Sequence, residues 1–544
     1  LGLLDFLSLS KPKAASSKLV MALRWLLSLG SFVAASSDAP EVAAPAGRLR
    51  GISDGEVHTF RGIPYAEAPV GALRWRPPVP LKPWQGVRDA SSYGSFCLQM
   101  RQGGSEDCLY LNVFVPMEAQ NTSRLPCLVW IHGGGYEFGS SNMYDPTKLT
   151  SFLRSQKSPS VLVTFNYRLN VFGFLGSDHL RPLDALHSTG NYGLQDQRMA
   201  LQWVQDNIMA FGGDPSKVMI FGQSAGAGSV SSHVTMPKSA GLFSRALMES
   251  GGFSDWAAQP MHMKELWFQR LMKQTKCVDV DCLINLSSEE ILGAYLAIPN
   301  GRCCSNLTGN PWVPWSPAID GVEMTAHPVD LLKQEKVSKV PMVIGTTWDD
   351  GATFFDDRSL SLEDFVPLFV EKYKSSQQQA ELYLSESHPS WPGYNDGWWS
   401  GERAVTDQNF YCTSNFARRS MAKLGLPIFG YVLAHSSSGA PIVQHSDDLP
   451  FVFRNLTKHA SAEEQQLSAD MAMSWYRFAA SADPRGPNCP WQQQSQEAAP
   501  ILKFQVASQG GNQVMDGNYR DRQCAFMMEW FDRNLHPETS GIFV

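Results

Sequence analysis

Apolar runs and helical patterns alternate along most of the chain. Four short runs are apolar at nearly every position, which is typical of strands buried on both faces of a parallel sheet: residues 128–131, 161–165, 218–221 and 342–344. Between the second and third runs, apolar residues at helical spacing predict a helix that ends at the Gly-Gly-Asp-Pro of residues 212–215; they are Leu201, Val204, Ile208 and Phe211. The alternation predicts an α/β fold with a large, mostly parallel central sheet flanked by helices. In such sheets the chemistry lies in loops at the carboxyl ends of the strands.

Composition narrows the class of protein. The chain has 544 residues, of which 43% are hydrophobic and 18% charged, and its formal net charge is −7. These values predict a buried core rather than disorder. The mild acidity predicts no nucleic-acid partner, and the lack of a long uncharged apolar run predicts no stable membrane span. From about Val42 onward the chain has no linker or repeat, so we expect one domain over residues 38–544.

The amino-terminal region has the pattern of a secretory signal. Residues 21–37 open with Met21 and Arg24, continue with an apolar stretch and end in small residues suited to signal peptidase. Residues 1–20 are interpreted as a non-native upstream extension or an extended leader. Asn-x-Ser/Thr sequons fit a glycosylated, secreted chain, and they lie at Asn121, Asn285, Asn306 and Asn455. We therefore expect an extracellular or secretory-pathway protein.

One motif suggests a nucleophilic serine. Residues 222–226, Gly-Gln-Ser-Ala-Gly, fit G-x-S-x-G and directly follow the apolar run 218–221. Small residues behind the motif open a predicted helix, which gives the strand–turn–helix of a nucleophile elbow. Glycines are needed because side chains two residues either side of Ser224 would collide with the neighbouring strand and helix. The turn holds the serine hydroxyl clear of the backbone at a helix N-terminus, where an oxyanion is stabilised.

A second motif complements the first. His132-Gly133-Gly134-Gly135 follows the predicted strand 128–131. Consecutive glycines allow backbone N–H groups to turn towards a ligand, as an oxyanion hole for acyl transfer requires. A flexible loop at the end of a strand is the alternative for the motif taken alone.

The ordered motifs resemble the type-B carboxylesterase/cholinesterase family of α/β hydrolases over residues 42–535. The matching stretches are residues 60–66 (FRGIPYA), 105–112 (SEDCLYLN), 130–135 (WIHGGG), 166–169 (NYRL), 190–197 (GNYGLQDQ), 211–215 (FGGDP) and the elbow. The resemblance implies the α/β-hydrolase fold with a helical and loop cap that forms a gorge. It also implies hydrolysis of carboxylic esters through an acyl-enzyme, with no metal or cofactor. Within the family, the chain resembles carboxylesterases rather than cholinesterases.

The resemblance supplies partners for Ser224. The family's acid lies in a G-x-x-x-[DE]-[ED]-G stretch, which here places it at Asp350, although Asp349 is the alternative. The family mostly has glutamate there, so the shorter aspartate requires its loop to lie closer to the histidine. His445 matches the family's H-x-x-[DE]-[LI]-x-[FY]-V-F pattern and would be the general base, then the general acid. The chain's His132, His233 and His435 are interpreted as structural residues.

Further site residues follow from the same resemblance. The oxyanion donors would be the backbone N–H groups of Gly134, Gly135 and Ala225. Trp256 and Phe354 would line the substrate pocket; the other aromatic residues between the acid and His445 fit either a pocket wall or a core. Gln223, the third pocket residue, stands where the family mostly has glutamate, and the missing negative charge weakens any preference for cationic substrates.

The cysteine pattern also follows the family. The resemblance implies disulfides Cys97–Cys108, Cys277–Cys282 and Cys412–Cys524. In cholinesterases the first loop is much longer and carries the tryptophan that binds choline; here residues 98–107 include no aromatic residue, which disfavours a choline esterase. Cys127 is predicted to be a buried free thiol, while Cys303, Cys304 and Cys489 are not assigned.

Two alternatives to a carboxylesterase remain at this point. A neutral-lipid or sterol-ester lipase would share the mechanism and differ in acyl-chain preference. A non-catalytic adhesion or structural relative would keep the fold, but such proteins have lost triad residues that this chain retains. The expected partner is accordingly a small-molecule or lipid ester, and the sequence does not define an oligomeric state.

Overall fold

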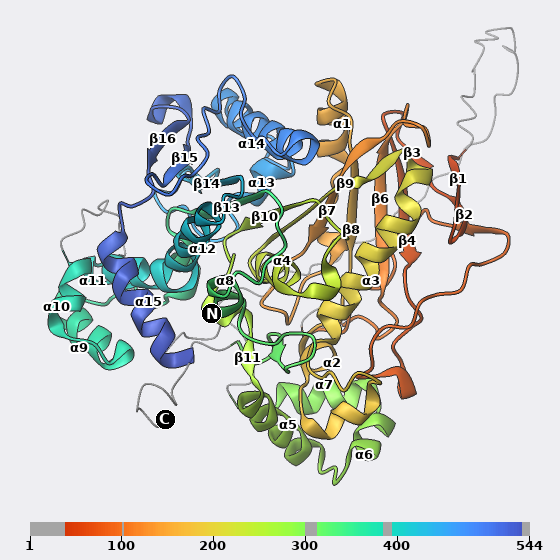
Figure 1. Cartoon of the computed structure of the whole chain (residues 1–544), viewed down its shortest axis with the longest axis horizontal. Coiled ribbons are helices and arrows are strands. Elements are labelled where there is room, and N and C mark those ends of the chain that lie inside the picture. The colour runs from red at the N-terminus through yellow and green to blue at the C-terminus, as the bar shows by residue number, and fades with distance from the viewer. Residues whose placement is uncertain (1–38, 101–102, 300–312, 385–393, 536–544) are drawn as a thin grey trace, which may run out of the picture. The chain divides into compact units, whose positions relative to one another are not determined.

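A mixed β-sheet forms the centre of the fold (Figure 1). The computed structural model describes residues 39–100, 103–299, 313–384 and 394–535. In this part of the chain eleven strands join the sheet, in the order β16 (Gln513–Asp516), β15 (Pro500–Phe504), β14 (Ile428–Leu433), β13 (Met342–Thr347), β10 (Arg245–Glu249), β9 (Gly213–Gln223), β7 (Leu125–Ile131), β8 (Val161–Phe165), β6 (Tyr110–Pro116), β4 (Val57–Pro64) and β3 (Ile52–Ser53). Neighbours are parallel from β15 through β8 and antiparallel at both edges. The mostly parallel sheet predicted from the sequence is therefore confirmed for the central strands, and the edges add antiparallel strands.

All four predicted strands are present, as β7, β8, β9 and β13. β9 is longer than predicted because it already pairs with β7 at Gly213, inside the stretch that we expected only to end a helix. The predicted helix is α3 (Tyr192–Asn207), and the last turn of its apolar stripe is a 3₁₀ turn over Ile208–Phe211. Gly212 then adopts φ 85°, a left-handed conformation that glycine adopts without steric cost and that ends the turn.

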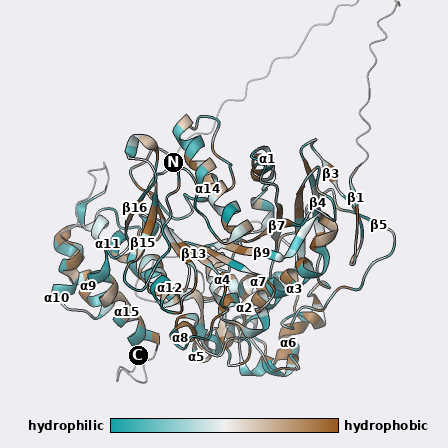
Figure 2. Ribbon diagram, turned by 45° about the horizontal axis from the view of Figure 1, so that its top comes forward, coloured by the Kyte–Doolittle hydropathy of each residue, from teal (hydrophilic) through white to brown (hydrophobic). Residues whose placement is uncertain are grey.

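Helices cover both faces of the sheet. Side chains alternate along β7, so that Val129 and Ile131 enter one apolar core while Leu128 and Trp130 enter the other. The first core is covered by α3, α4 (Ala225–Thr235), α8 (Pro328–Lys333) and α12 (Cys412–Lys423). The second is covered by α1 (Thr147–Ser155), α13 (Leu449–Val452) and α14 (Ala462–Ser481). Figure 2 shows the hydrophobic strands inside and hydrophilic residues on the outer faces of the helices.

Other elements are inserted between the central strands. Between β13 and β14 the chain forms α9 (Leu362–Tyr373), α10 (Gln377–Ala380), α11 (Asp396–Thr406) and a π-helical turn (Asp407–Tyr411) that runs into α12. The remaining elements are α2 (Asn170–Phe174), α5 (Met261–Thr275), α6 (Val280–Asn285), α7 (Ser288–Leu296), α15 (Asp521–Leu535) and the short strands β1 (Glu41–Ala44), β2 (Gly47–Arg50), β5 (Val87–Asp89), β11 (Gln259–Pro260) and β12 (Ala318–Ile319). Aromatic residues of α9 pack into the first core, so they are core residues; they are Phe365, Phe369 and Tyr373.

The structure forms the three disulfides that the resemblance implied, Cys97–Cys108, Cys277–Cys282 and Cys412–Cys524. Cys127 is a buried free thiol in β7, as predicted, and Cys489 is a second one. Among the described helices, none is long and apolar enough to cross a membrane. The interpretations of residues 1–20 and 21–37, and the residues Cys303, Cys304 and Asn306, lie outside the described residues.

Candidate active site

Ser224 lies on a strained turn between β9 and α4. Its backbone has φ 57° and ψ −127°, a combination that a non-glycine residue adopts only where its surroundings impose it. A Cβ on Gly226 would lie 2.0 Å from the carbonyl oxygen of Ile131, and one on Gly222 would lie 2.7 Å from that same oxygen. The two glycines of the motif are therefore required by the close approach of α4 to β7, as the sequence predicted.

The structure brings Asp350 and His445 together. Asp350 follows β13 and is fully buried, and His445 lies in the segment between β14 and α13. Nδ1 of His445 is 2.7 Å from Oδ1 of Asp350, and the backbone N–H of Thr347 donates to the other carboxylate oxygen at 3.0 Å. The shorter aspartate thus reaches the imidazole.

Asp349 is directed elsewhere. Its Oδ1 lies 2.6 Å from Nη2 of Arg403, and its Oδ2 accepts the backbone N–H of Val443 at 2.8 Å. Burial raises the pKa of Asp349, while the Arg403 charge opposes that rise. The geometry therefore favours Asp350 over Asp349 as the partner of His445.

Nε2 of His445 is hydrogen-bonded to the side chain of Gln223. The side-chain nitrogen of Gln223 lies 3.0 Å from this atom, and Gln223 is only 2% exposed. If Nδ1–H of the imidazole donates to Asp350, Nε2 is an acceptor and the amide of Gln223 is its donor. Within the described residues, no hydrogen bond joins Ser224 to His445 in this structure. Gln223, which we expected in the substrate pocket, thus lies directly against the imidazole.

The glycine-rich loop passes over the serine. A Cβ on Gly133 would lie 3.0 Å from Cβ of Ser224, and Gly134 and Gly135 adopt φ 109° and 59°. In the described chain, the backbone N–H groups of Gly134, Gly135 and Ala225 donate to no other protein group. These three N–H groups are therefore available as hydrogen-bond donors.

His132 has a packing role in this loop. It is buried, its ring stacks on Tyr167 at 4.4 Å, and its Nδ1 lies 2.9 Å from the carbonyl oxygen of Gly133. Burial lowers its pKa to about 4, so the ring is neutral at physiological pH. His233 is likewise buried, between Ser239 and Gln197.

Three aromatic side chains wall the site. Phe354 and Phe410 lie 5.0 Å and 4.8 Å from the His445 ring, and Trp256 lies 6.4 Å from Phe410. Trp256 is fixed by a hydrogen bond from Nε1 to the carbonyl oxygen of Asn409. Trp256 and Phe354 were predicted pocket residues, whereas Phe410 was missed. It comes from the π-helical turn, a feature that often occurs at functional sites.

Buried acids lie close to the site. The carbonyl oxygen of Glu249 accepts the backbone N–H of Ser224, and its side chain accepts the indole N–H of Trp475 at 2.6 Å. Burial, followed by the charge of Asp448, raises the pKa of Glu249 well above its ordinary value. Burial, followed by the charge of Asp350, likewise raises the pKa of Asp448 to about 7. Among the described residues, no cluster of histidine, cysteine or acidic side chains could hold a metal ion.

The chain is similar to known esterases over most of its length. A solved carboxylesterase from Geobacillus stearothermophilus superposes with a TM-score of 0.77 at 31% identity, covering 90% of this chain and 99% of that chain. Carboxylesterase 1D of Rattus norvegicus is 31% identical over 89% of this chain and 91% of that protein. Para-nitrobenzyl esterase of Bacillus subtilis (strain 168) is 32% identical over 84% of this chain and 93% of that protein.

These similarities define the class as α/β hydrolases that act as serine esterases. The family model described as "Carboxylesterase family" matches residues 38–527. The chain belongs to this family, and it is a carboxylic ester hydrolase.

Proposed function

We propose that Ser224 is the nucleophile, His445 the general base and then general acid, and Asp350 the acid that orients the imidazole. The contact of 2.7 Å between His445 and Asp350, made beside the strained Ser224 turn, carries this assignment. Asp350 holds the proton of the imidazole on Nδ1 and stabilises the imidazolium that forms during the reaction. Nε2 is thereby left as the atom that accepts the serine proton. The amide of Gln223 must give up this atom when Ser224 approaches it.

The reaction proceeds in two halves. Oγ of Ser224 bonds to the ester carbonyl carbon while its proton passes to Nε2 of His445, and the carbonyl oxygen becomes an oxyanion. The N–H groups of Gly134, Gly135 and Ala225 bind that oxyanion. The carbon–oxygen bond to the alcohol then breaks, and His445 returns the proton to the departing oxygen. Water repeats these steps on the acyl-enzyme and releases the carboxylic acid.

The site favours uncharged esters. Trp256, Phe354 and Phe410 provide apolar walls, and the amide of Gln223 brings no negative charge next to the serine. Apolar walls of this kind suit the acyl or alcohol group of a small-molecule or lipid ester. A long-chain lipase shares every step and differs only in the chain length that these walls accept.

We further propose that the protein is secreted after removal of a signal over residues 21–37, and that residues 38–544 form one catalytic domain. Three disulfides suit an oxidising compartment. The sequon residues within the described chain have exposed side chains available for glycosylation; they are Asn121, Asn285 and Asn455.

Labelling with a fluorescent organophosphonate tests the catalytic assignment. The parent protein should be labelled and should hydrolyse p-nitrophenyl acetate, and Ser224→Ala should lose both properties. Ser231→Ala is the matched control because Ser231 lies in the same helix and its hydroxyl donates only to the carbonyl oxygen of Gly228. Labelling or full turnover of Ser224→Ala would overturn the assignment.

A further inference from the structure

The glycine-rich loop is closed at its base by Gly139. The N–H groups of Glu137 and Phe138 donate to the carbonyl oxygen of Gly134, which folds the loop back on itself. Gly139 has φ 105°, and a Cβ there would lie only 2.6 Å from the carbonyl oxygen of Gly133. The Gly139 backbone is therefore packed against one edge of the peptide unit that joins Gly133 to Gly134.

This contact bears on the proposed oxyanion donor. The carbonyl of Gly133 and the N–H of Gly134 belong to one planar peptide unit and point to opposite sides of it. A displacement of Gly139 that moves the Gly133 oxygen therefore re-aims the Gly134 N–H. Donors of an oxyanion hole act only within a narrow range of position, and a misplacement of about 1 Å costs about 100-fold in rate.

Gln99 holds Gly139 with both atoms of its amide. Oε1 accepts the N–H of Gly139 at 3.0 Å, and Nε2 donates to the carbonyl oxygen of Gly139 at 3.0 Å. Gln99 is 1% exposed, so these bonds are shielded from water. Two bonds to one residue fix its orientation as well as its position, much as a neighbouring strand would.

Gln99 is itself held within the loop closed by Cys97–Cys108. Its Nε2 also donates to the carbonyl oxygen of Cys97 at 3.0 Å. Its backbone N–H donates to the carbonyl oxygen of Gly103 at 2.9 Å. Asn170 connects the same two loops, because its Nδ2 donates to the carbonyl oxygen of Leu98 at 2.8 Å. The backbone N–H of Asn170 donates to the carbonyl oxygen of Tyr136 in the glycine-rich loop. The two loops are thus joined at two places.

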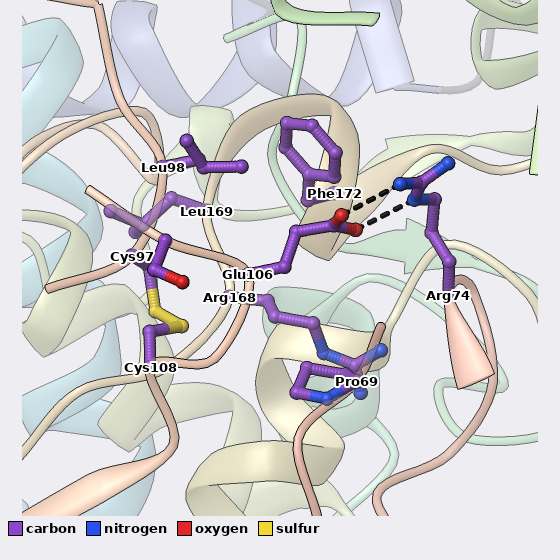
Figure 3. A pocket seen from close by; sticks show the side chains of 10 residues that line it. Pro69, Arg74, Cys97, Leu98, Glu106, Cys108, Arg168, Leu169 and Phe172 are labelled. Atoms are coloured by element: carbon purple, nitrogen blue, oxygen red, sulfur yellow. Dashed lines mark hydrogen bonds and ion pairs between the residues drawn. A yellow bond between two sulfur atoms is a disulfide. The ribbon is translucent and has the colours of Figure 1, made fainter. Parts of the chain in front are cut away.

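The other end of the disulfide loop is also fixed. Figure 3 shows the disulfide beside Leu98 and, further along, the two parallel bonds from Arg74 to Glu106, each 2.6 Å long. These residues enclose a cavity of about 10 Å³, the space of one water molecule. Glu106, near the second cysteine of the disulfide loop, is thus bound to Arg74 by two hydrogen bonds.

We infer that Gln99 is a positioning residue for ester hydrolysis: through Gly139 it fixes the peptide unit that presents the Gly134 N–H to the oxyanion. The inference rests on the proposed roles of Ser224 and Gly134. Gln99 touches neither the substrate nor the serine, and its effect is on the transition state, in which the oxyanion develops, more than on the bound ester.

Gln99→Met tests the inference because methionine has a similar shape and cannot make the bonds to Gly139. We expect kcat for p-nitrophenyl acetate to fall about 10- to 100-fold while KM stays within about twofold. The inhibition constant of a trifluoromethyl ketone, whose adduct with the serine carries an oxyanion, should rise in parallel with the loss in kcat/KM. A purely structural role would lower the melting temperature without this parallel.

Gln205→Met is the matched control. The amide of Gln205 also donates to two backbone carbonyls, those of Pro215 and Leu242, but Pro215 lies near the start of β9 and Ser224 follows its end. This variant should keep the parent kcat and inhibition constant. If Gln99→Met does not fold, Gln99→Asn replaces it, because its shorter side chain holds the amide one methylene away from Gly139. The same changes in kcat and in the inhibition constant are then expected.

The Ser224 and Gln99 variants distinguish failure of the proposed catalytic function from failure of the positioning role of Gln99. Full turnover of Ser224→Ala would refute the proposed function. An inactive Ser224→Ala together with parent values of kcat and inhibition constant in the Gln99 variant would overturn the role of Gln99 alone, as would a loss of kcat without weaker inhibitor binding.

Discussion

The side-chain nitrogen of Gln223 lies 3.0 Å from Nε2 of His445, the atom that accepts the proton of Ser224 in the proposed mechanism. A neutral imidazole whose Nδ1–H faces Asp350 has a single acceptor, so the amide and the serine hydroxyl compete for it. In this structure the proposed base is therefore hydrogen-bonded to the residue that precedes the proposed nucleophile in the chain.

This competition predicts a gain of reactivity in Gln223→Met. A hydrogen bond between neutral groups contributes about 0.5–1.5 kcal/mol, so its removal should speed phosphonylation of Ser224 by about 2- to 10-fold. The second-order labelling rate with an organophosphonate measures the effect, with Gln205→Met as control. Slower labelling of Gln223→Met would show instead that the amide supports the imidazole.

The acid can be assigned by two neighbouring substitutions. Asp350→Asn should lower kcat by about 10³- to 10⁴-fold, because the imidazole loses both its orientation and the negative charge that stabilises its protonated form. Asp349→Asn should chiefly reduce thermal stability, since it weakens a buried ion pair with Arg403. Steady-state kinetics and a melting curve for each variant check this, and a reversed pattern would move the role to Asp349.

The aromatic wall predicts the acyl-chain preference. Phe410 stands between Trp256 and His445, so Phe410→Ala should open space for a longer chain. We expect the ratio of kcat/KM for p-nitrophenyl hexanoate over acetate to rise about 10-fold or more, since each additional methylene that becomes buried contributes about 0.8 kcal/mol. Phe365→Leu, in the core contributed by α9, should leave the ratio unchanged. An unaltered ratio in Phe410→Ala would show that this residue does not limit the pocket.

The buried Asp255 predicts a pH dependence of stability. Burial raises its pKa from 3.8 to about 7, although Gln408 and the backbone N–H of Trp256 both donate to it. Between these two values the folded protein retains a proton that the unfolded chain has lost. Stability is therefore highest below about pH 4 for this group and falls as pH rises to about 7, by on the order of 1.4 kcal/mol per pH unit.

Asp255→Asn removes that proton linkage. The urea midpoint of the variant should decline less steeply between pH 4.5 and 7 than the midpoint of the parent. Asp206→Asn, at an exposed position, is the control and should follow the parent. Identical slopes for all three proteins would contradict the assignment.

The long-range disulfide predicts a large stability difference. Cys412 and Cys524 are separated by 112 residues, whereas Cys277 and Cys282 are separated by 5. In the chain-entropy description, the long loop contributes about 4.7 kcal/mol and the short one about 2 kcal/mol. Urea unfolding of Cys412→Ser/Cys524→Ser and Cys277→Ser/Cys282→Ser should show the larger loss for the first pair. Equal losses would show that native-state packing, not loop length, governs these bridges.

Sequence alone predicted four of the central strands and the strand–turn–helix around Ser224, but it did not predict the equally buried central strands β10 and β14. A strand buried on both faces is apolar at every position, so β7, β8, β9 and β13 stand out as short apolar runs. The edge strands are only partly buried or very short, and their sequences carry no comparable signal. The beginning of β9 was missed because its glycine and proline are typical of a turn, yet the pairing with β7 outweighs that preference.

The candidate site was predicted less completely. Asp349 and Asp350 are adjacent and chemically alike, so only the direction in which the turn after β13 points each carboxylate separates them. The contact of Gln223 with His445 joins residues far apart in the chain. Phe410 was missed because a π-helical turn depends on packing and leaves no periodic pattern in the sequence.

The spacing of the proposed triad has a consequence for how the enzyme would fail. Ser224 follows β9, Asp350 follows β13 and His445 follows β14, so the imidazole arrives with the last third of the chain. Partial opening that detached β14 and the segments after it would leave the elbow intact and yet abolish hydrolysis. Turnover then indicates whether the carboxyl-terminal strands are docked. During mild denaturation, the distance between a fluorophore on that region and the elbow should increase as activity is lost.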